Sequence, residues 1–293
     1  MNPFTRRNFL KAGVAAGALA SVETLNLRAE PETATSWVTL GKSDMKVTRL
    51  ALGTGTFSGR TQQELGQEGF TRLVRHAYDR GIRFYETAES YGESQQMLGV
   101  ALKGIPRESY RLMTKVTTWD TGNPMAKLDE LRRNCDTEYY DIMLLHWQHT
   151  ADWPETSLRW QDAILEAQEK KTVLSHGASV HGLPALAQVP DDKWLQIAMI
   201  RMNHKGVRMD TPVADAHELG NVPEVVERVK QAKANGLGVI SMKLAGEGTF
   251  GREDRQKAMR FAFRHAGVDA VTVGFKAPSE IDEAIDNLNA AFA

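Results

Sequence analysis

Four residues whose side chains could carry proton-transfer chemistry lie in the first half of the chain: Glu86, Tyr91, Lys115 and His146. The lysine follows the glutamate by 29 positions, and the histidine follows the lysine by 31. A strand and its following helix take about 30 residues, so this interval predicts that the three residues end consecutive parallel strands. A phenol, an ammonium, a carboxylate and an imidazole gathered at one rim suit general acid–base catalysis.

The segment that must position the first two of these residues reads GIRFYETAESYGESQQML, residues 81–98. Its apolar start predicts a short buried strand, and Gly92 with Ser94 opens the next helix. Glu86 and Tyr91 are therefore expected where a strand passes into a helix. In a barrel of alternating strands and helices, functional residues lie at that end of the strands.

Eight strand-like runs follow one another along the chain. They are RLALG, IRFYETA, YRLMTKV, YYDIMLLH, VLSHGASV, LQIAMIRM, GVISMKL and AVTVGF. Helical patterns separate most of them, including residues 62–80, 125–135, 160–168, 222–234, 252–265 and 279–291. Eight alternating units without a low-complexity insert predict an α/β protein with a single (β/α)8 TIM barrel over residues 37–293. Between the fifth and sixth strands, residues 182–194 must supply a short or irregular helix.

The N-terminal region predicts two further features. Residues 37–40 and 46–52 flank the turn at 41–44 and predict a β-hairpin ahead of the barrel. Before them, Arg6-Arg7 precedes an apolar run over residues 12–22 and resembles a twin-arginine export signal. That run is too short for stable membrane insertion, which takes about 20 apolar residues.

We therefore predict a twin-arginine signal peptide over residues 1–29, with the export machinery as a partner and the periplasm as the destination. A disordered or amphipathic surface tail is the alternative. Residues 30–36 have no periodicity and predict a linker that contributes nothing to the core.

Composition narrows the classes of function. The chain has 293 residues, 42% of them hydrophobic, and a formal net charge of −1. No basic cluster interleaved with aromatic residues is present, so no nucleic-acid partner is expected, and small neutral or weakly charged substrates are favoured. Cys135 is the only cysteine, which excludes an intrachain disulfide and a cysteine-based metal cluster.

These motifs resemble the aldo-keto reductase family, whose members carry a strand similar to FDTAxxYG, then a strand-end lysine, then a strand-end histidine followed by tryptophan or a similar residue. The matching positions are Glu86, Tyr91, Lys115, His146 and Trp147. Glu86 departs from the family's aspartate but keeps the five-residue spacing to Tyr91. The resemblance implies hydride transfer between NADP(H) and an aldehyde or ketone.

The resemblance implies that Tyr91 is the general acid and that the positive charge of Lys115 favours the ionised form of Tyr91. Glu86 holds the Lys115 ammonium, and His146 orients the carbonyl oxygen. Two alternatives stay open. Because glutamate is one methylene longer than aspartate, the barrel could be a catalytically weak nicotinamide-binding or sensor protein. The additional histidines could also belong to a metal-dependent hydrolase, although no HExxH spacing is present and no metal site is predicted.

The resemblance also implies a wall of cofactor-binding residues after the strands: Gly53, Thr54, Gly55, Ser179, His181, Asn203, Met242, Lys243, Gly274 and Lys276. The family's GxSN motif contacts the nicotinamide carboxamide through serine and asparagine. Ser179 matches the serine, and His181 replaces the asparagine while keeping a hydrogen-bond donor. Met199 stands where many members have glutamine.

The start of the last predicted helix resembles the loop that grips the adenosine phosphate. Backbone amides at a helix N-terminus together with Lys276 suit an anion. Glu280, however, stands where many members use arginine. NADP(H) is therefore the expected cofactor, with NAD(H) as the alternative.

Overall fold

The computed structural model of the protein describes residues 32–213 and 218–293, which contain eight parallel strands closed into a barrel. Every strand pairs with its neighbours in chain order, and β10 closes the circle on β3. The eight predicted strands are confirmed. The predicted signal peptide, residues 1–29, lies outside the described residues.

The barrel strands are β3 (Leu50–Gly53), β4 (Phe84–Glu86), β5 (Arg111–Thr117), β6 (Tyr140–Gln148), β7 (Val173–Val180), β8 (Ile197–Arg201), β9 (Gly238–Met242) and β10 (Ala270–Val273). Along β6, Ile142 and Leu144 join the core inside the barrel, whereas Met143 and Leu145 join the core under the helices. This alternation follows from the two-residue period of a strand.

The same alternation along the strands sets the direction of the candidate catalytic side chains. Phe84, Met113 and Leu144 belong to the inner core. Glu86, Lys115 and His146 each follow one of these three by two positions. Their side chains are therefore directed into the barrel at its C-terminal end, as the spacing of these residues predicted. Lys115 and His146 lie two residues before the ends of β5 and β6, not at the last position.

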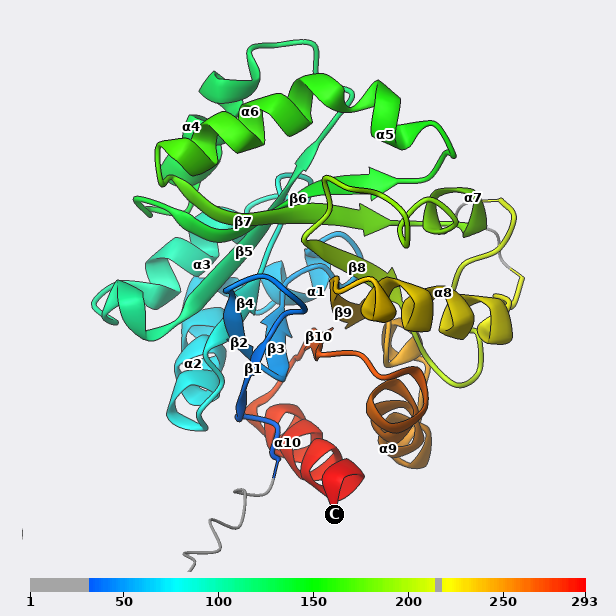
Figure 1. Cartoon of the computed structure of the whole chain (residues 1–293). Coiled ribbons are helices and arrows are strands. Elements are labelled where there is room, and N and C mark those ends of the chain that lie inside the picture. The colour runs from blue at the N-terminus through cyan, green and yellow to red at the C-terminus, as the bar shows by residue number, and fades with distance from the viewer. Residues whose placement is uncertain (1–31, 214–217) are drawn as a thin grey trace, which may run out of the picture. The chain divides into compact units, whose positions relative to one another are not determined.

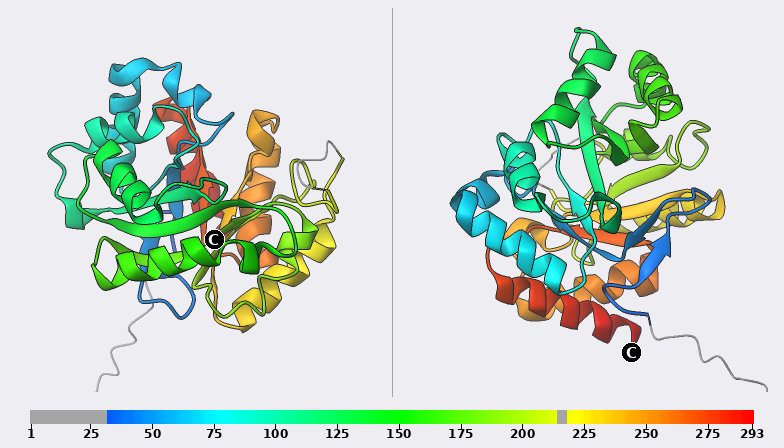
Figure 2. Two further views of the ribbon diagram at one scale, coloured as in Figure 1. Left: turned by 90° about the horizontal axis from the view of Figure 1, so that it is seen from above. Right: turned by 90° about the vertical axis from the view of Figure 1, so that its left-hand side faces the viewer.

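Helices surround the strands in all three views (Figures 1 and 2). They are α1 (Arg60–Gln63), α2 (Gly66–Asp79), α3 (Ser94–Leu102), α4 (Pro124–Asn134), α5 (Trp153–Thr156), α6 (Leu158–Glu169), α7 (Leu183–Leu186), α8 (Val222–Ala234), α9 (Arg252–Arg260) and α10 (Pro278–Phe292). The short α7 is the irregular helix expected between the fifth and sixth strands.

Two helix predictions need correction. The single helix expected over residues 62–80 is divided into α1 and α2, because Gly66 adopts a left-handed φ of 63° that interrupts the helical ladder. The helix expected over residues 252–265 begins as α9 but continues as a π-helical segment, Phe261–Ala266. Gly267, with a φ of 78°, ends this segment.

The predicted hairpin is present as the antiparallel pair β1 (Trp37–Thr39) and β2 (Lys46–Thr48). Leu40, Met45 and Val47 pack with the inner core of the barrel, so the hairpin covers the N-terminal end of the strands. The linker prediction was wrong for Ala34, which is fully buried and donates its backbone N–H to Asn289 of α10. Small residues between polar neighbours gave no signal of this packing.

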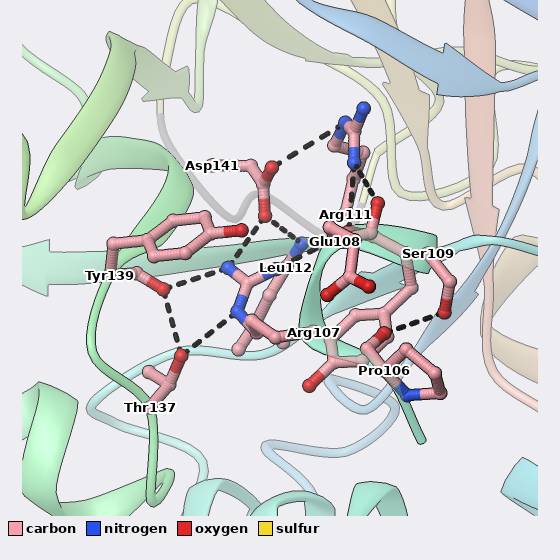
Figure 3. Close-up of polar contacts among 10 residues, drawn as sticks. Pro106, Arg107, Glu108, Ser109, Arg111, Leu112, Thr137, Tyr139 and Asp141 are labelled. Carbon is pink, nitrogen blue, oxygen red and sulfur yellow. Dashed lines mark hydrogen bonds and ion pairs between the residues drawn. The ribbon is translucent and has the colours of Figure 1, made fainter.

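An ion cluster around the buried Asp141 lies where β5 and β6 begin, at the end of the barrel opposite the candidate catalytic residues (Figure 3). Asp141 accepts hydrogen bonds from the Arg107 guanidinium at 2.7 Å and from the Leu112 backbone N–H at 2.9 Å. Arg111 approaches the same carboxylate at 3.4 Å. These contacts join the two strands, and their place at the N-terminal face indicates a role in stability.

Candidate active site

A cavity of about 490 Å3 opens at the C-terminal end of the strands. One end is lined by Glu86 and Tyr91, and the other reaches α9 and α10 through Arg255, Glu283 and Asn287. Its volume lies within the range of small-molecule and cofactor sites, about 300–1,000 Å3. The cavity therefore connects Glu86 and Tyr91 with the region predicted to bind the adenosine end of a cofactor, whereas Lys115 and His146 do not line it.

Lys115, Glu86 and Tyr91 form one hydrogen-bonded group. The Lys115 ammonium is fully buried and donates to the Glu86 carboxylate, to the Thr87 carbonyl oxygen at 3.1 Å and to the Tyr91 hydroxyl at 3.0 Å. All three hydrogens of the ammonium thus have an acceptor. The predicted contacts between the lysine, the carboxylate and the phenol are present.

The longer side chain of Glu86 is accommodated by two other strands. Its second carboxylate oxygen accepts a hydrogen bond from the Thr272 hydroxyl of β10 at 3.1 Å. At Gly53 of β3, an added Cβ would lie 2.8 Å from the Glu86 carboxylate and 2.5 Å from the Thr272 hydroxyl. Any larger residue at position 53 would take the space that the glutamate now fills.

Burial dominates the electrostatics of this group. It raises the pKa of Tyr91 well above its usual value, and the Glu86 carboxylate adds to the rise. Burial also lowers the pKa of the Lys115 ammonium, which the Glu86 carboxylate opposes. The Lys115 ammonium is shared between the Glu86 carboxylate and the Tyr91 hydroxyl. Tyr91 is held as a neutral phenol, the form that can donate a proton.

His146 lies beside the phenol, with the two rings edge to face and their centres 5.4 Å apart. Its Nδ1 is 3.1 Å from the Ser90 hydroxyl. Burial lowers the pKa of His146 well below its usual value, and the charges of Lys115 and Lys243 add to this. A neutral imidazole at this position can donate a hydrogen bond to a substrate oxygen without carrying charge.

Aromatic side chains continue outward from His146. Trp147 has a left-handed φ of 55° at a register shift between β6 and β7. Its ring lies 4.1 Å from that of His149 and 6.1 Å from that of Trp119, which is 62% exposed. A strained backbone beside a candidate site is typical of functional positions.

The predicted cofactor residues divide into two groups. The residues that line the cavity are Gly53, Gly55, Met242, Lys243, Gly274 and Lys276. At Gly55 an added Cβ would lie 2.6 Å from the Tyr91 ring, so this position requires glycine for the close approach. The residues that do not line the cavity are Thr54, Ser179, His181 and Asn203, all of which are buried.

The members of the second group have different surroundings. The Thr54 hydroxyl has no hydrogen-bond partner within the described part of the chain. The Asn203 side chain is engaged with backbone groups, donating to the carbonyls of Val207 and Lys243 and accepting from the N–H groups of Lys205 and Val207. It therefore holds the loop after β8.

The far end of the cavity carries both signs of charge. Arg255 of α9 makes two hydrogen bonds, of 2.8 and 3.0 Å, to the Glu283 carboxylate of α10. The Lys276 backbone N–H donates to the Glu280 carboxylate at 2.7 Å. The Lys276 backbone N–H, which could meet a phosphate, is thus already paired with a carboxylate, and so is the Arg255 guanidinium.

Several residues of the site gave no signal in the sequence. Thr272 bonds to Glu86 across 186 positions of the chain. Glu247 pairs with Lys243 and lies 3.4 Å from the Arg208 guanidinium.

Within residues 32–213 and 218–293, no group of three or more His, Cys, Asp or Glu side chains could hold a metal ion.

Comparisons with known proteins agree with this geometry. A family model described as "Aldo/keto reductase family" matches residues 49–258, and a twin-arginine translocation signal model matches residues 3–22. A Glycine max protein named probable aldo-keto reductase 1 is 28% identical over 227 residues, which cover 73% of this chain and 60% of that protein. A methylglyoxal reductase of Escherichia coli is 28% identical over 131 residues, 43% of this chain and 45% of that enzyme. The match thus spans less than two thirds of either relative.

Solved structures share the fold. An aldo-keto reductase from Bacillus halodurans, in its holo form, superposes with a TM-score of 0.68 at 18% identity, covering 87% of this chain and 91% of that one. A Pseudomonas aeruginosa protein assigned to the aldo-keto reductases gives a TM-score of 0.72 at 20% identity, covering 90% and 99%. At these identities the likeness establishes the barrel fold alone.

Proposed function

The chain belongs to the aldo/keto reductase family, and from this membership we propose that it transfers hydride between NADP(H) and the carbonyl carbon of an aldehyde or ketone. The observation that carries the proposal is the buried contact of the Lys115 ammonium with both the Glu86 carboxylate and the Tyr91 hydroxyl. Members of the family are in general NAD(P)H-dependent oxidoreductases.

Each residue of the group has a proposed role in this reaction. Tyr91, kept as a phenol by burial, donates the proton that the carbonyl oxygen takes up. Lys115 holds the phenol oxygen in position and is itself held by Glu86. His146, as a neutral donor, orients the carbonyl oxygen. When bound, the nicotinamide supplies the hydride that reduces the carbonyl carbon to the alcohol.

The cavity residues present are compatible with a nicotinamide dinucleotide. Gly53, Gly55 and Gly274 line the cavity without side chains, and Lys243 adds a cation to its lining. Lys276 would hold a phosphate at the far end. The direct test is to incubate the purified protein with a reactive aldehyde and each reduced cofactor and to follow the loss of cofactor absorbance. Absence of turnover with both cofactors would contradict the proposal.

Cofactor choice is our first prediction. Lys276→Ala should weaken NADPH binding by up to about fivefold and leave NADH nearly unchanged, since an exposed charge pair contributes at most ~1 kcal/mol. NAD(H) is the second candidate cofactor, favoured by the contact between the Glu280 carboxylate and the Lys276 amide. Glu280→Gln should therefore strengthen NADPH relative to NADH.

Fluorescence titration with both cofactors measures these affinities. Glu253→Gln is the matched control, because it removes the same charge from α9 at a position that pairs with Lys257 and does not line the cavity. Equal losses for both cofactors in Lys276→Ala would remove that lysine from phosphate binding.

The pH dependence of the rate is the second prediction. Tyr91 has a raised pKa and His146 a lowered one, so neither group changes its charge between about pH 6.5 and about pH 9. Turnover at saturating substrate should be constant over this range and should fall on the alkaline side of it, where Tyr91 loses its proton. A rate that falls with a midpoint near pH 7 would show that one of the two assignments is incorrect.

The family-model match at residues 3–22 supports export by the twin-arginine route, and we place the mature protein in the periplasm. Among the described residues, no helix is both long and apolar enough to cross a bilayer. Changing Arg6 and Arg7 together to lysine should leave the full-length protein in the cytoplasm. Cell fractionation measures this, and an unchanged periplasmic yield would refute it.

A further inference from the structure

A second hollow lies on the surface of the barrel along α9, one of the outer helices in Figure 1. It has a volume of about 450 Å3, and we call it the α9 groove. It shares no lining residue with the cavity at the strand ends. The residues that line it are His204, Lys257, Arg260, Phe261, Arg264 and His265. All its polar side chains are therefore basic, and the described residues contribute no carboxylate to the lining.

Two separate elements bring these side chains together. Lys257 and Arg260 belong to α9, and Arg264 lies in the π-helical segment Phe261–Ala266 that continues it. Residues three or four positions apart are neighbours on a helix surface, and like charges at this spacing destabilise the helix slightly. Cations in the last turn suit the helix dipole. His204, however, comes from the loop after β8, so the dipole does not account for the whole cluster.

Arg264 is held in place by neutral groups. Its Nε and Nη2 each donate to a backbone carbonyl of α10, those of Ala291 and Phe292, at 2.7 Å. These acceptors orient the guanidinium but do not neutralise its charge. Its Nη1 carries two more N–H donors, for which the described residues provide no hydrogen-bond acceptor.

The acidic side chains next to the groove are already paired with other basic residues. Glu253 pairs with Lys257 at 2.7 Å. Asp254 pairs with Lys205 at 2.6 Å and lies 3.5 Å from Nε2 of His204. Neither carboxylate is therefore left to compensate the arginines.

Arg260 and Arg264 are exposed and have no such partner. Within residues 32–213 and 218–293, neither of them makes an ion pair. Two arginine charges along one helix are therefore left without an anion of the protein. Phe261 lies between them in the chain, so this segment does interleave basic and aromatic residues, contrary to the expectation from the sequence.

We propose that the α9 groove binds a phosphate-type oxyanion, with Arg260 and Arg264 as the residues that contact it. The planar fork of an arginine donates in pairs to the oxygens of a phosphate, which a halide ion cannot match. Lys257 and Arg264 are about 10 Å apart along the helix axis, at ~1.5 Å per residue, so the charged run suits one small anion. π-helical turns that interrupt a helix are frequent at functional sites.

The site is independent of the proposed reductase reaction, because it uses no residue of the cavity. A soluble phosphate compound and the head group of a phospholipid both carry the oxyanion that it would recognise. The experiments below test the shared chemistry first and the source afterwards.

Arg260→Gln should weaken the binding of inorganic phosphate about tenfold, the order of one hydrogen-bonded contact to a charged group. Isothermal titration calorimetry at constant ionic strength measures this, with sodium chloride as the blank. Arg252→Gln is the matched control, because it removes the same charge from the exposed surface of α9 at a position outside both the groove and the cavity. An equal loss in the control, or no loss in Arg260→Gln, would overturn the proposal.

Nitrogen-15 NMR of the imidazole groups locates the bound phosphate. His204 and His265 line the groove, whereas His76 of α2 pairs with Asp282 of α10 and does not line it. At constant pH, phosphate should shift the resonances of His204 and His265 and leave those of His76 unchanged. His204→Asn and His265→Asn identify the resonances by their loss. Shifts confined to other histidines would place the phosphate elsewhere and overturn the site.

Vesicles separate the two sources of the phosphate group. Cosedimentation is measured with vesicles of phosphatidylcholine alone and with vesicles that also contain phosphatidylglycerol. Cosedimentation only with the second kind, lost in Arg260→Gln, would assign the groove to a lipid head group. Phosphate binding without cosedimentation would assign it to a soluble phosphate compound. If the protein binds neither phosphate nor the anionic vesicles, the proposal is wrong.

Discussion

Replacing Tyr91 with phenylalanine should lower cofactor-dependent reduction of a reactive aldehyde about 10²–10⁴-fold, the usual contribution of a positioned proton donor. The phenol is the one member of the buried group that lines the cavity and carries a transferable proton at neutral pH. Removing it leaves the carbonyl oxygen to take its proton from solvent. The measurement is turnover at saturating cofactor and substrate.

The same substitution should leave the fold and cofactor affinity nearly unchanged. Lys115 keeps its contacts with Glu86 and with the Thr87 carbonyl, and the ring that packs against Gly55 is retained. Tyr85→Phe is a matched control, because it removes a buried phenol hydroxyl from β4 on the face under the helices. A Tyr91→Phe protein as fast as its parent would disprove the reductase mechanism.

Glu86→Asp should reduce turnover by about 10²-fold, the order expected when a catalytic group moves by about 1 Å. The shorter carboxylate cannot reach both the Lys115 ammonium and the Thr272 hydroxyl, which Glu86 now contacts together. The barrel is built around the longer residue, because Gly53 leaves the room that it occupies. Restoring the family's aspartate would therefore impair the site.

Glu86→Gln tests the charge separately from the length. Lys115 is fully buried, so loss of its counter-charge should destabilise the fold by about 3–5 kcal/mol, as measured for broken buried ion pairs, and should also lower turnover. Denaturant unfolding gives the first quantity. Thr272→Val is the control for the hydrogen bond alone, and it should have little further effect in the Glu86→Asp background.

The opposite pattern would support the sensor alternative. If the parent protein binds cofactor without turning over any aldehyde, while Glu86→Asp is active, the glutamate is an impairment and the barrel serves in binding. The hydrogen bond from Thr272 to Glu86 argues that Glu86→Asp lowers turnover, because a misplaced carboxylate would have no dedicated partner on β10.

Local pattern determined the barrel and the direction of the proposed catalytic side chains. The two-residue period of β4, β5 and β6 runs unbroken from the inner core to Glu86, Lys115 and His146. The 30-residue repeat of strand and helix then brings the three ends to one rim. Both periods are properties of consecutive residues, so they can be read without tertiary structure.

The contacts between residues that lie far apart in the chain were decided only when the barrel closed. Thr272 meets Glu86 only because β10 returns to β3, and Asp210 meets Gly182 only because the loop after β8 folds back over the end of β7. The rise in the pKa of Tyr91 likewise comes first from burial in the closed barrel and next from the Glu86 carboxylate of a different segment. Such contacts join residues far apart in the chain through three-dimensional packing, and no spacing along the sequence encodes them.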